Sequence, residues 1–168
     1  MDLLQACQEY RIAPMISFSI TSLGGTAYEP GVMKASDLLD RIEDLIEQGL
    51  INPQTTTIRI DPIVPGITQE SDVEAIINRC QSLGITNFVS SIMQSYGYLE
   101  GTAKDRGVIS ALRNIGYNWD AHYSRKADGK LAHVANLATG QKWGGFLKSM
   151  MEKYNISIKS CSSNNLGL

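Results

Sequence analysis

The sequence predicts an α/β fold, in which parallel strands alternate with helices in a partial (β/α) barrel. Two observations favour this fold class. Short segments with the every-second-residue alternation of strands are followed by segments with the apolar spacing of amphipathic helices. The first two strand segments also carry polar residues on one whole face, which suits a barrel lumen better than a sheet covered by helices on both sides.

The expected elements make residues 1–168 a single domain. In chain order they are a helix (2–10), a strand (15–21), a helix (36–48), a strand (57–61), a helix (71–83), a strand (87–93), a helix (108–115), a long loop (118–141), a helix (143–154) and a strand (156–159). Ser71 and Glu74 have the spacing of a capping box, with Ser71 as the N-cap of its helix. The loop over 118–141 is predicted because periodicity is weak there and Gly, Asp and Asn are frequent.

The first two strands present two chemically different faces. The apolar face, expected to pack on the helices, consists of Ile16, Phe18, Ile20, Ile58 and Ile60. The polar face consists of Ser17, Ser19, Thr21, Thr57, Arg59 and Asp61. Because burying an unpaired Arg or Asp is costly, we expect Arg59 and Asp61 in a polar lumen near the C-terminal strand ends. An Arg59–Asp61 pair that merely fills the barrel, or two residues at an exposed strand end, would give the same pattern.

Composition excludes several classes of function. The formal net charge is −2 and the basic residues are scattered, so the chain lacks the positive footprint of a general nucleic-acid-binding protein, while a local basic groove is left open. No apolar run is long enough to cross a membrane, and the first residues lack the pattern of a signal peptide. We therefore expect a cytoplasmic protein.

The cysteines do not form a recognisable site. Cys7, Cys80 and Cys161 are far apart, which fits neither a disulfide framework nor a closely spaced metal or cluster motif. Cys80 lies on the apolar face of an expected helix, so it is interpreted as a core residue, and Cys7 similarly. Cys161 is left open as a free thiol or as a ligand in a larger assembly. No metal site is predicted within the chain.

Other catalytic patterns are weak. His122 and His133 both fall in the expected loop, with no Ser-His-Asp order or HExxH spacing, and are expected to be solvated. Gly24 and Gly25 would let backbone amides approach an anion but match no nucleotide-binding fingerprint. The last expected helix carries an apolar stripe interpreted as core: Trp143, Phe146, Leu147, Met150, Met151 and Tyr154.

Four stretches taken together resemble a known family. The strand over 16–21 is followed by Glu29-Pro30-Gly31, then by Leu39-Asp40-Arg41-Ile42, and then by Arg59-Ile60-Asp61-Pro62-Ile63-Val64-Pro65-Gly66. This order resembles the middle of radical S-adenosylmethionine (SAM) proteins of the spore photoproduct lyase and DNA-repair-photolyase-like group. There, a serine-rich strand, an EPG turn and a run like R-[IVF]-D-P-I-[IV]-P-G follow one another. The match covers residues 15–93, and its most specific part is the RIDPIVPG run.

The resemblance implies that this chain is the C-terminal half of such a domain. Ser17, Ser19 and Thr21 would contact SAM, Glu29 would lie in the turn above it, and Arg59 and Asp61 would lie at the cofactor's edge. In the family, a [4Fe-4S] cluster bound by CxxxCxxC cleaves SAM to a radical that abstracts hydrogen from the substrate. The ligands of that cluster are absent from this chain, because it contains no CxxxCxxC motif.

Three functions are compatible with these observations. The first is the C-terminal half of a radical SAM enzyme, inactive without an N-terminal half that carries the cluster. The second is a cluster-free binding or scaffold protein with a half-barrel cleft. The third is an unrelated barrel enzyme that uses Glu29, Arg59 and Asp61. Its expected partner is an N-terminal half-domain or a second copy, docked on the edge of the first strand, since segment 15–21 lacks the Pro and Lys that protect edges. Resemblance to a DNA-lesion enzyme does not itself indicate DNA, because fold alone does not decide the substrate.

Overall fold

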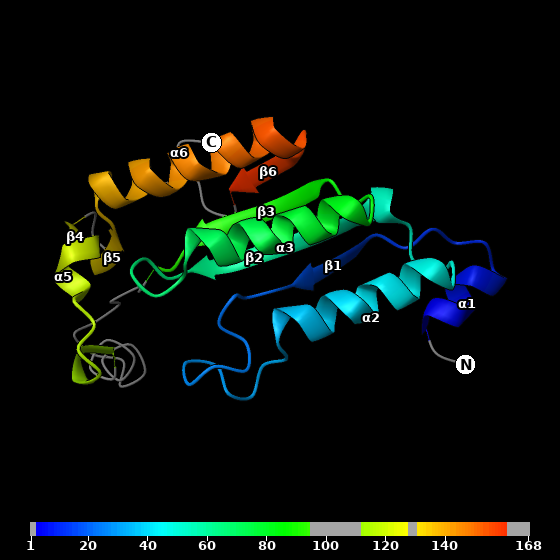
Figure 1. Cartoon of the computed structure of the whole chain (residues 1–168), viewed down its shortest axis with the longest axis horizontal. Coiled ribbons are helices and arrows are strands. Elements are labelled where there is room, and N and C mark those ends of the chain that lie inside the picture. Colours follow the sequence, from blue (N-terminus) through cyan, green and yellow to red (C-terminus); the bar gives the residue numbers. More distant parts are fainter. Residues whose placement is uncertain (1–2, 95–111, 128–130, 161–168) are drawn as a thin grey trace.

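A parallel sheet with helices between its strands forms the body of the protein (Figure 1). The computed structural model describes residues 3–94, 112–127 and 131–160. Its helices are α1 (Leu3–Glu9), α2 (Ala35–Glu47), α3 (Glu70–Ser82), α5 (Trp119–His122) and α6 (Leu137–Tyr154), with a 3-10 turn η1 (Pro53–Thr55). Its strands are β1 (Ile16–Ser19), β2 (Thr56–Ile63), β3 (Asn87–Ile92), β4 (Tyr123–Ala127), β5 (Leu131–Ala135) and β6 (Ser157–Ser160).

The sheet confirms the predicted fold class. Four strands lie in the order β1-β2-β3-β6, and every neighbouring pair is parallel. The strands β4 and β5 form a separate antiparallel pair. Within the residues that the structure describes, the sheet is open and does not close into a barrel. The chain is thus an α/β protein with strands alternating with helices.

One face of this sheet carries the core. Figure 1 shows α2, α3 and α6 on the same side, as right-handed connections require when each new strand is added in one direction. Ile58 and Ile60 of β2 are buried on that side, and α3 contributes Ile77 and Cys80, both fully buried. The interpretation of Cys80 as core is therefore confirmed. The interpretation of the apolar stripe of α6 as core is also confirmed. Trp143, Leu147 and Met150 are buried, and Phe146, Met151 and Tyr154 are partly buried against the core.

The predicted capping box is wrong. Helix α3 begins at Glu70 with Gln69 as its N-cap, so Ser71 lies inside the first turn. The helix starts early because the preceding turn is closed locally: the Thr68 hydroxyl accepts from the Val64 N–H at 2.9 Å, and the Thr68 N–H donates to the Val64 carbonyl at 2.8 Å.

Glu74, the other member of that expected box, instead ties α3 to α6. It accepts hydrogen bonds from Lys153 Nζ at 2.6 Å and from the Tyr154 hydroxyl at 2.9 Å. The Lys153 ammonium, and after it the Tyr154 hydroxyl, hold the pKa of Glu74 below its ordinary value. The carboxylate therefore joins two helices rather than capping one.

The predicted loop over 118–141 is also wrong. This segment contains α5, the β4–β5 pair and the start of α6. Two asparagines that read as loop residues are N-caps: Asn118 Oδ1 accepts from the Ala121 N–H at 3.3 Å, and Asn136 Oδ1 accepts from the Thr139 N–H at 2.9 Å. Packing rather than local pattern fixes the segment, since Trp119 is buried and stacks on Tyr123 with ring centroids 4.0 Å apart.

Two further expectations concern the rest of the chain. Of the helix expected over 108–115, residues 112–114 are helical and residues 108–111 lie outside the described residues, as does Cys161. Among the described helices, none combines the length and the apolar character needed to cross a membrane.

Candidate functional site

The face of the sheet opposite α2, α3 and α6, here called the open face, carries polar residues from every strand. The strand register aligns them in rows across the sheet. One row is Ser17, Thr57, Asn87 and Ser157, and the next is Ser19, Arg59, Val89 and Lys159. The expectation that Arg59 and Asp61 share a face with Ser17 and Ser19, away from the helices, is therefore confirmed.

A charged cluster lies near the C-terminal end of β2 on this face. Arg59 Nη2 lies 3.0 Å from Asp61 Oδ2, and the hydroxyl of Ser91 on β3 donates to the other oxygen of the same carboxylate. The side chains of Arg59 and Asp61 are 35% and 21% exposed. The ion pair between Arg59 and Asp61, which the sequence allows as a possible filling of a barrel interior, does form, but solvent reaches both side chains. A ligand can reach both charges without breaking the core.

Thr21 and Glu29 form a second polar contact, in the loop that follows β1. The Thr21 hydroxyl donates to Glu29 Oε2, and the Gly25 N–H donates to the Glu29 carbonyl at 3.0 Å. Gly24 lies so close to the Met33 carbonyl that any Cβ there would collide with it, which explains the glycine. The loop thus holds Glu29 against the residue that continues the polar face of β1.

The six predicted site residues therefore fall into three sets. Arg59 and Asp61 are ion-paired, Thr21 and Glu29 are hydrogen-bonded, and Ser17 and Ser19 are exposed on the open face. Sequence reasoning missed Ser91 because the facing of its strand was ambiguous. The neighbouring Ser90 is fully buried and donates to the Ile60 carbonyl at 2.8 Å, which places Ser91 on the open face.

The expectation of a solvated His122 is wrong. This residue ends α5, is half-buried, and stacks on Tyr117 with ring centroids 5.8 Å apart and planes 22° apart. Burial raises the pKa of Tyr117 to about 12 and also raises that of Tyr123. Both phenols therefore stay protonated near neutral pH, and the Tyr117 hydroxyl donates to the Pro65 carbonyl. The side chain of His133 lies outside the described part of the chain.

The described residues do not fit an iron–sulfur cluster. Cys7 is half-buried on α1, while Cys80 is fully buried on α3, where burial raises its thiol pKa to about 12. A cluster needs several thiolates that converge on it, and a protonated core thiol does not serve as one. Over residues 3–94, 112–127 and 131–160, no group of three or more His, Cys, Asp or Glu side chains is placed to hold a metal ion.

Comparison with family models gave no match to this chain, and neither did comparison with curated proteins or with solved structures.

Proposed function

We propose that this chain is the C-terminal half of a (β/α) barrel domain of the radical SAM type, and that its open face holds SAM. The observation that carries this is the accessible Arg59–Asp61 pair on a polar sheet face, with the described sheet-covering helices all packed on the other face. Such a face resembles the wall of a barrel lumen, and its charges lie near the strand ends where barrel sites occur.

The donor set of the open face fits SAM chemically. The guanidinium of Arg59 suits the carboxylate of the methionyl group, and carboxylates such as Asp61 and Glu29 suit its ammonium or the ribose hydroxyls. Ser17 and Ser19 add neutral donors and acceptors along β1. When bound, SAM supplies an activated adenosyl group. Because this chain contains no CxxxCxxC motif, the proposed complementary half-domain would supply the [4Fe-4S] cluster.

Arg59→Ala is expected to weaken SAM binding by the full chain at least about tenfold, because a charge-assisted hydrogen bond contributes about 1.5–3 kcal/mol. The free energy of unfolding should change by no more than about 1 kcal/mol, since ion pairs that solvent reaches add little stability. Isothermal titration calorimetry and urea unfolding measure the two quantities.

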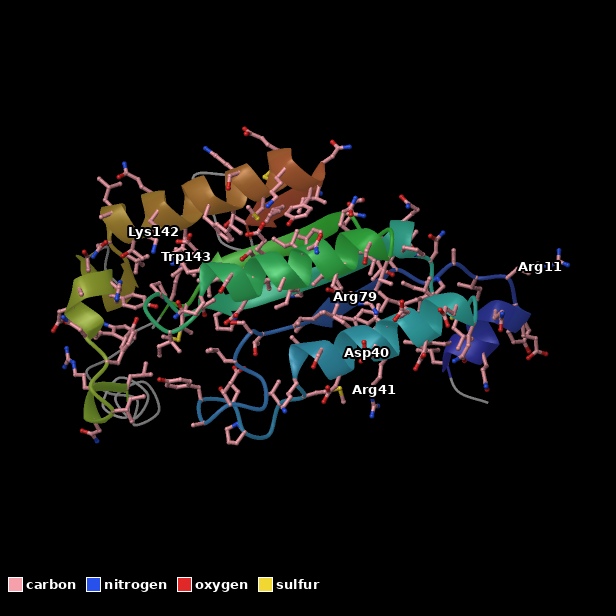
Figure 2. All side chains as sticks on the ribbon, viewed as in Figure 1. Arg11, Asp40, Arg41, Arg79, Lys142 and Trp143 are labelled. Carbon is pink, nitrogen blue, oxygen red and sulfur yellow. The ribbon has the colours of Figure 1, made fainter. Side chains whose placement is uncertain are left out.

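Arg41→Ala is the matched control for this test. Arg41 is an exposed arginine of α2, the helix on the far side of the sheet from the open face (Figure 2). Its loss removes the same charge and should leave SAM affinity unchanged. Equal weakening by both variants, or no saturable binding by the unaltered chain up to about 1 mM SAM, would contradict the assignment.

The isolated chain is expected not to assemble a [4Fe-4S] cluster. Its cysteines lack the required spacing, and the described ones do not offer converging thiolates. Anaerobic reconstitution followed by iron analysis and Mössbauer spectroscopy measures this directly. A stoichiometric cubane cluster on the monomer would show that the cysteine argument is wrong.

A cluster-free binding protein with the same half-barrel cleft is the second candidate, favoured by the missing CxxxCxxC motif. It shares the open face but has no need of a complementary half. SAM binding by a chain that stays monomeric would favour this second candidate over the first.

A further inference from the structure

A cavity of about 460 Å³ lies beyond the C-terminal end of β2, between the starts of α3 and α6. We call it the α3–α6 cavity. None of the six residues assigned to the open-face site lines it. Its principal polar and aromatic lining residues are Glu70, Ser71, His122, Thr139, Lys142 and Trp143. Figure 2 shows Lys142 and Trp143 at the start of α6, the end of that helix nearest α5.

Thr139 is one of two buried polar residues that line this cavity; the other, Thr68, has its hydroxyl engaged by the Val64 N–H. The residue is 8% exposed, and its N–H is used by the N-cap, since it donates to Asn136 Oδ1 at 2.9 Å. Its hydroxyl, by contrast, donates no hydrogen bond to any residue that the structure describes. The hydroxyl is not among the described side-chain atoms that are shut off from solvent without a partner, so it opens to the cavity it lines. A hydroxyl in this position, on the wall of a cavity and not used by the protein, is available to a ligand.

His122 also lines the cavity and packs against an aromatic neighbour. Its ring stacks on Tyr117, whose hydroxyl is itself fixed to the Pro65 carbonyl. A Cβ built on Gly66 would lie 2.7 Å from His122 Nε2, and Gly66 has a φ of 82°. Glycine is therefore required at this position both by its backbone conformation and by the close approach of the ring. The result is a positioned ring nitrogen at the cavity.

The rim carries one balanced ion pair and several hydrogen-bond donors that an anion can use. Lys142 Nζ lies 3.0 Å from Glu70 Oε1, with side chains 70% and 40% exposed, so the pair is weak enough for Lys142 to turn to a ligand. Glu70 is the one carboxylate among the described lining residues, and Lys142 neutralises it. Helix α3 starts at the cavity without a side-chain cap, so backbone N–H groups of its first turn add donors there, although Glu70 and Asp72 in the same turn offset the positive potential of the helix N-terminus.

We propose that the α3–α6 cavity binds a phosphate monoester with a small organic body. The phosphate would accept from Lys142, Thr139 and Ser71, the donor types that phosphate sites use. The cavity is larger than one phosphate group, and the apolar surfaces of Pro65 and Trp143 line the remainder. This site adds to the proposed open-face function and does not depend on it.

The test is a titration of the full ¹⁵N-labelled chain with inorganic phosphate and with glycerol 3-phosphate, followed by heteronuclear NMR. Saturable chemical-shift changes are expected for the amide resonances of Glu70, Ser71 and Thr139. Glycerol 3-phosphate is expected to bind more tightly than inorganic phosphate. Lys142→Ala and Thr139→Val should each weaken binding about tenfold. Lys148→Ala, which removes an exposed lysine of the same helix outside the cavity lining, should leave it unchanged.

Thr139→Ser keeps the hydroxyl and is expected to retain affinity, which separates loss of the donor from loss of folding if Thr139→Val is unstable. The absence of saturable shifts would overturn the proposal. So would equal weakening by Lys142→Ala and Lys148→Ala, which would indicate a general charge effect, or unaltered affinity in a folded Thr139→Val variant. Because SAM is not used, failure here is distinguishable from failure of the open-face site.

Discussion

Phe88→Ala is expected to lower the free energy of unfolding by about 3–5 kcal/mol, the usual cost of emptying a large aromatic position in a packed core. Phe88 lies on β3, an inner strand of the sheet, and is 2% exposed on the side covered by the helices. Truncation leaves a cavity that flanking strands and helices cannot fill without moving. Urea unfolding followed by circular dichroism measures the change in the transition midpoint and its slope.

Val89→Ala, one residue along the same strand, is the matched control. Val89 lies half-buried on the open face, in the row that contains Ser19 and Arg59. Its truncation should cost less than about 1 kcal/mol, because few atoms are removed from a packed environment. A cost for Val89→Ala approaching that for Phe88→Ala would mean that the open face is covered in the folded protein, and the half-barrel interpretation would then need revision.

The chain is expected not to remain a simple monomer, but to self-associate or bind a complementary half-domain through the outer edge of β1. Strand β1 lies at one end of the sheet order, next to β2 alone. The Ile20 N–H, just after β1, points toward β2, because it donates to the Arg59 carbonyl at 2.9 Å. Alternate residues of a strand point their backbone groups to the same side, so Ser17 and Ser19 point theirs outward.

This edge lacks the usual protection. Segment Ile16–Ser19 contains neither Lys nor Pro, and Met15 beside it is 88% exposed. The opposite edge strand, β6, carries Lys159, a residue type that discourages strand pairing. Sedimentation velocity over a concentration series is expected to show a mass that rises above 18.4 kDa. Hydrogen exchange should show that the Ser17 and Ser19 amides become protected as the assembly forms.

Ser17→Pro removes one outward N–H and should reduce the association, whereas Ser17→Ala changes the same side chain, retains the N–H and should not. A mass that stays at 18.4 kDa at all concentrations, with the Ser17 and Ser19 amides already strongly protected, would show that the chain covers this edge itself. The complementary-half assignment would then lose its structural basis.

The first half of the fold was predictable from sequence because its signals are local. Alternation with a period of two identifies β1 and β2, and it also places Arg59 and Asp61 opposite the buried Ile58 and Ile60. The apolar spacing of α2, α3 and α6 identifies the faces that cover the sheet. Such patterns arise because each helix or strand must bury one face, so the residues that form the pattern are only a few positions apart in the sequence.

Features that depend on contacts between distant segments were decided only by the tertiary structure. The sequence identified the polar face with Arg59 and Asp61, but the pairing of β2 with β3 was needed to bring Ser91 to the same carboxylate. Segment 118–141 has no strong periodicity, yet stacking of Trp119 on Tyr123 and capping by Asn136 give it structure. The α3–α6 cavity likewise joins a loop after β2, helix α5 and the start of α6. No local pattern encodes such sites, because their energy comes from packing between residues far apart in the chain.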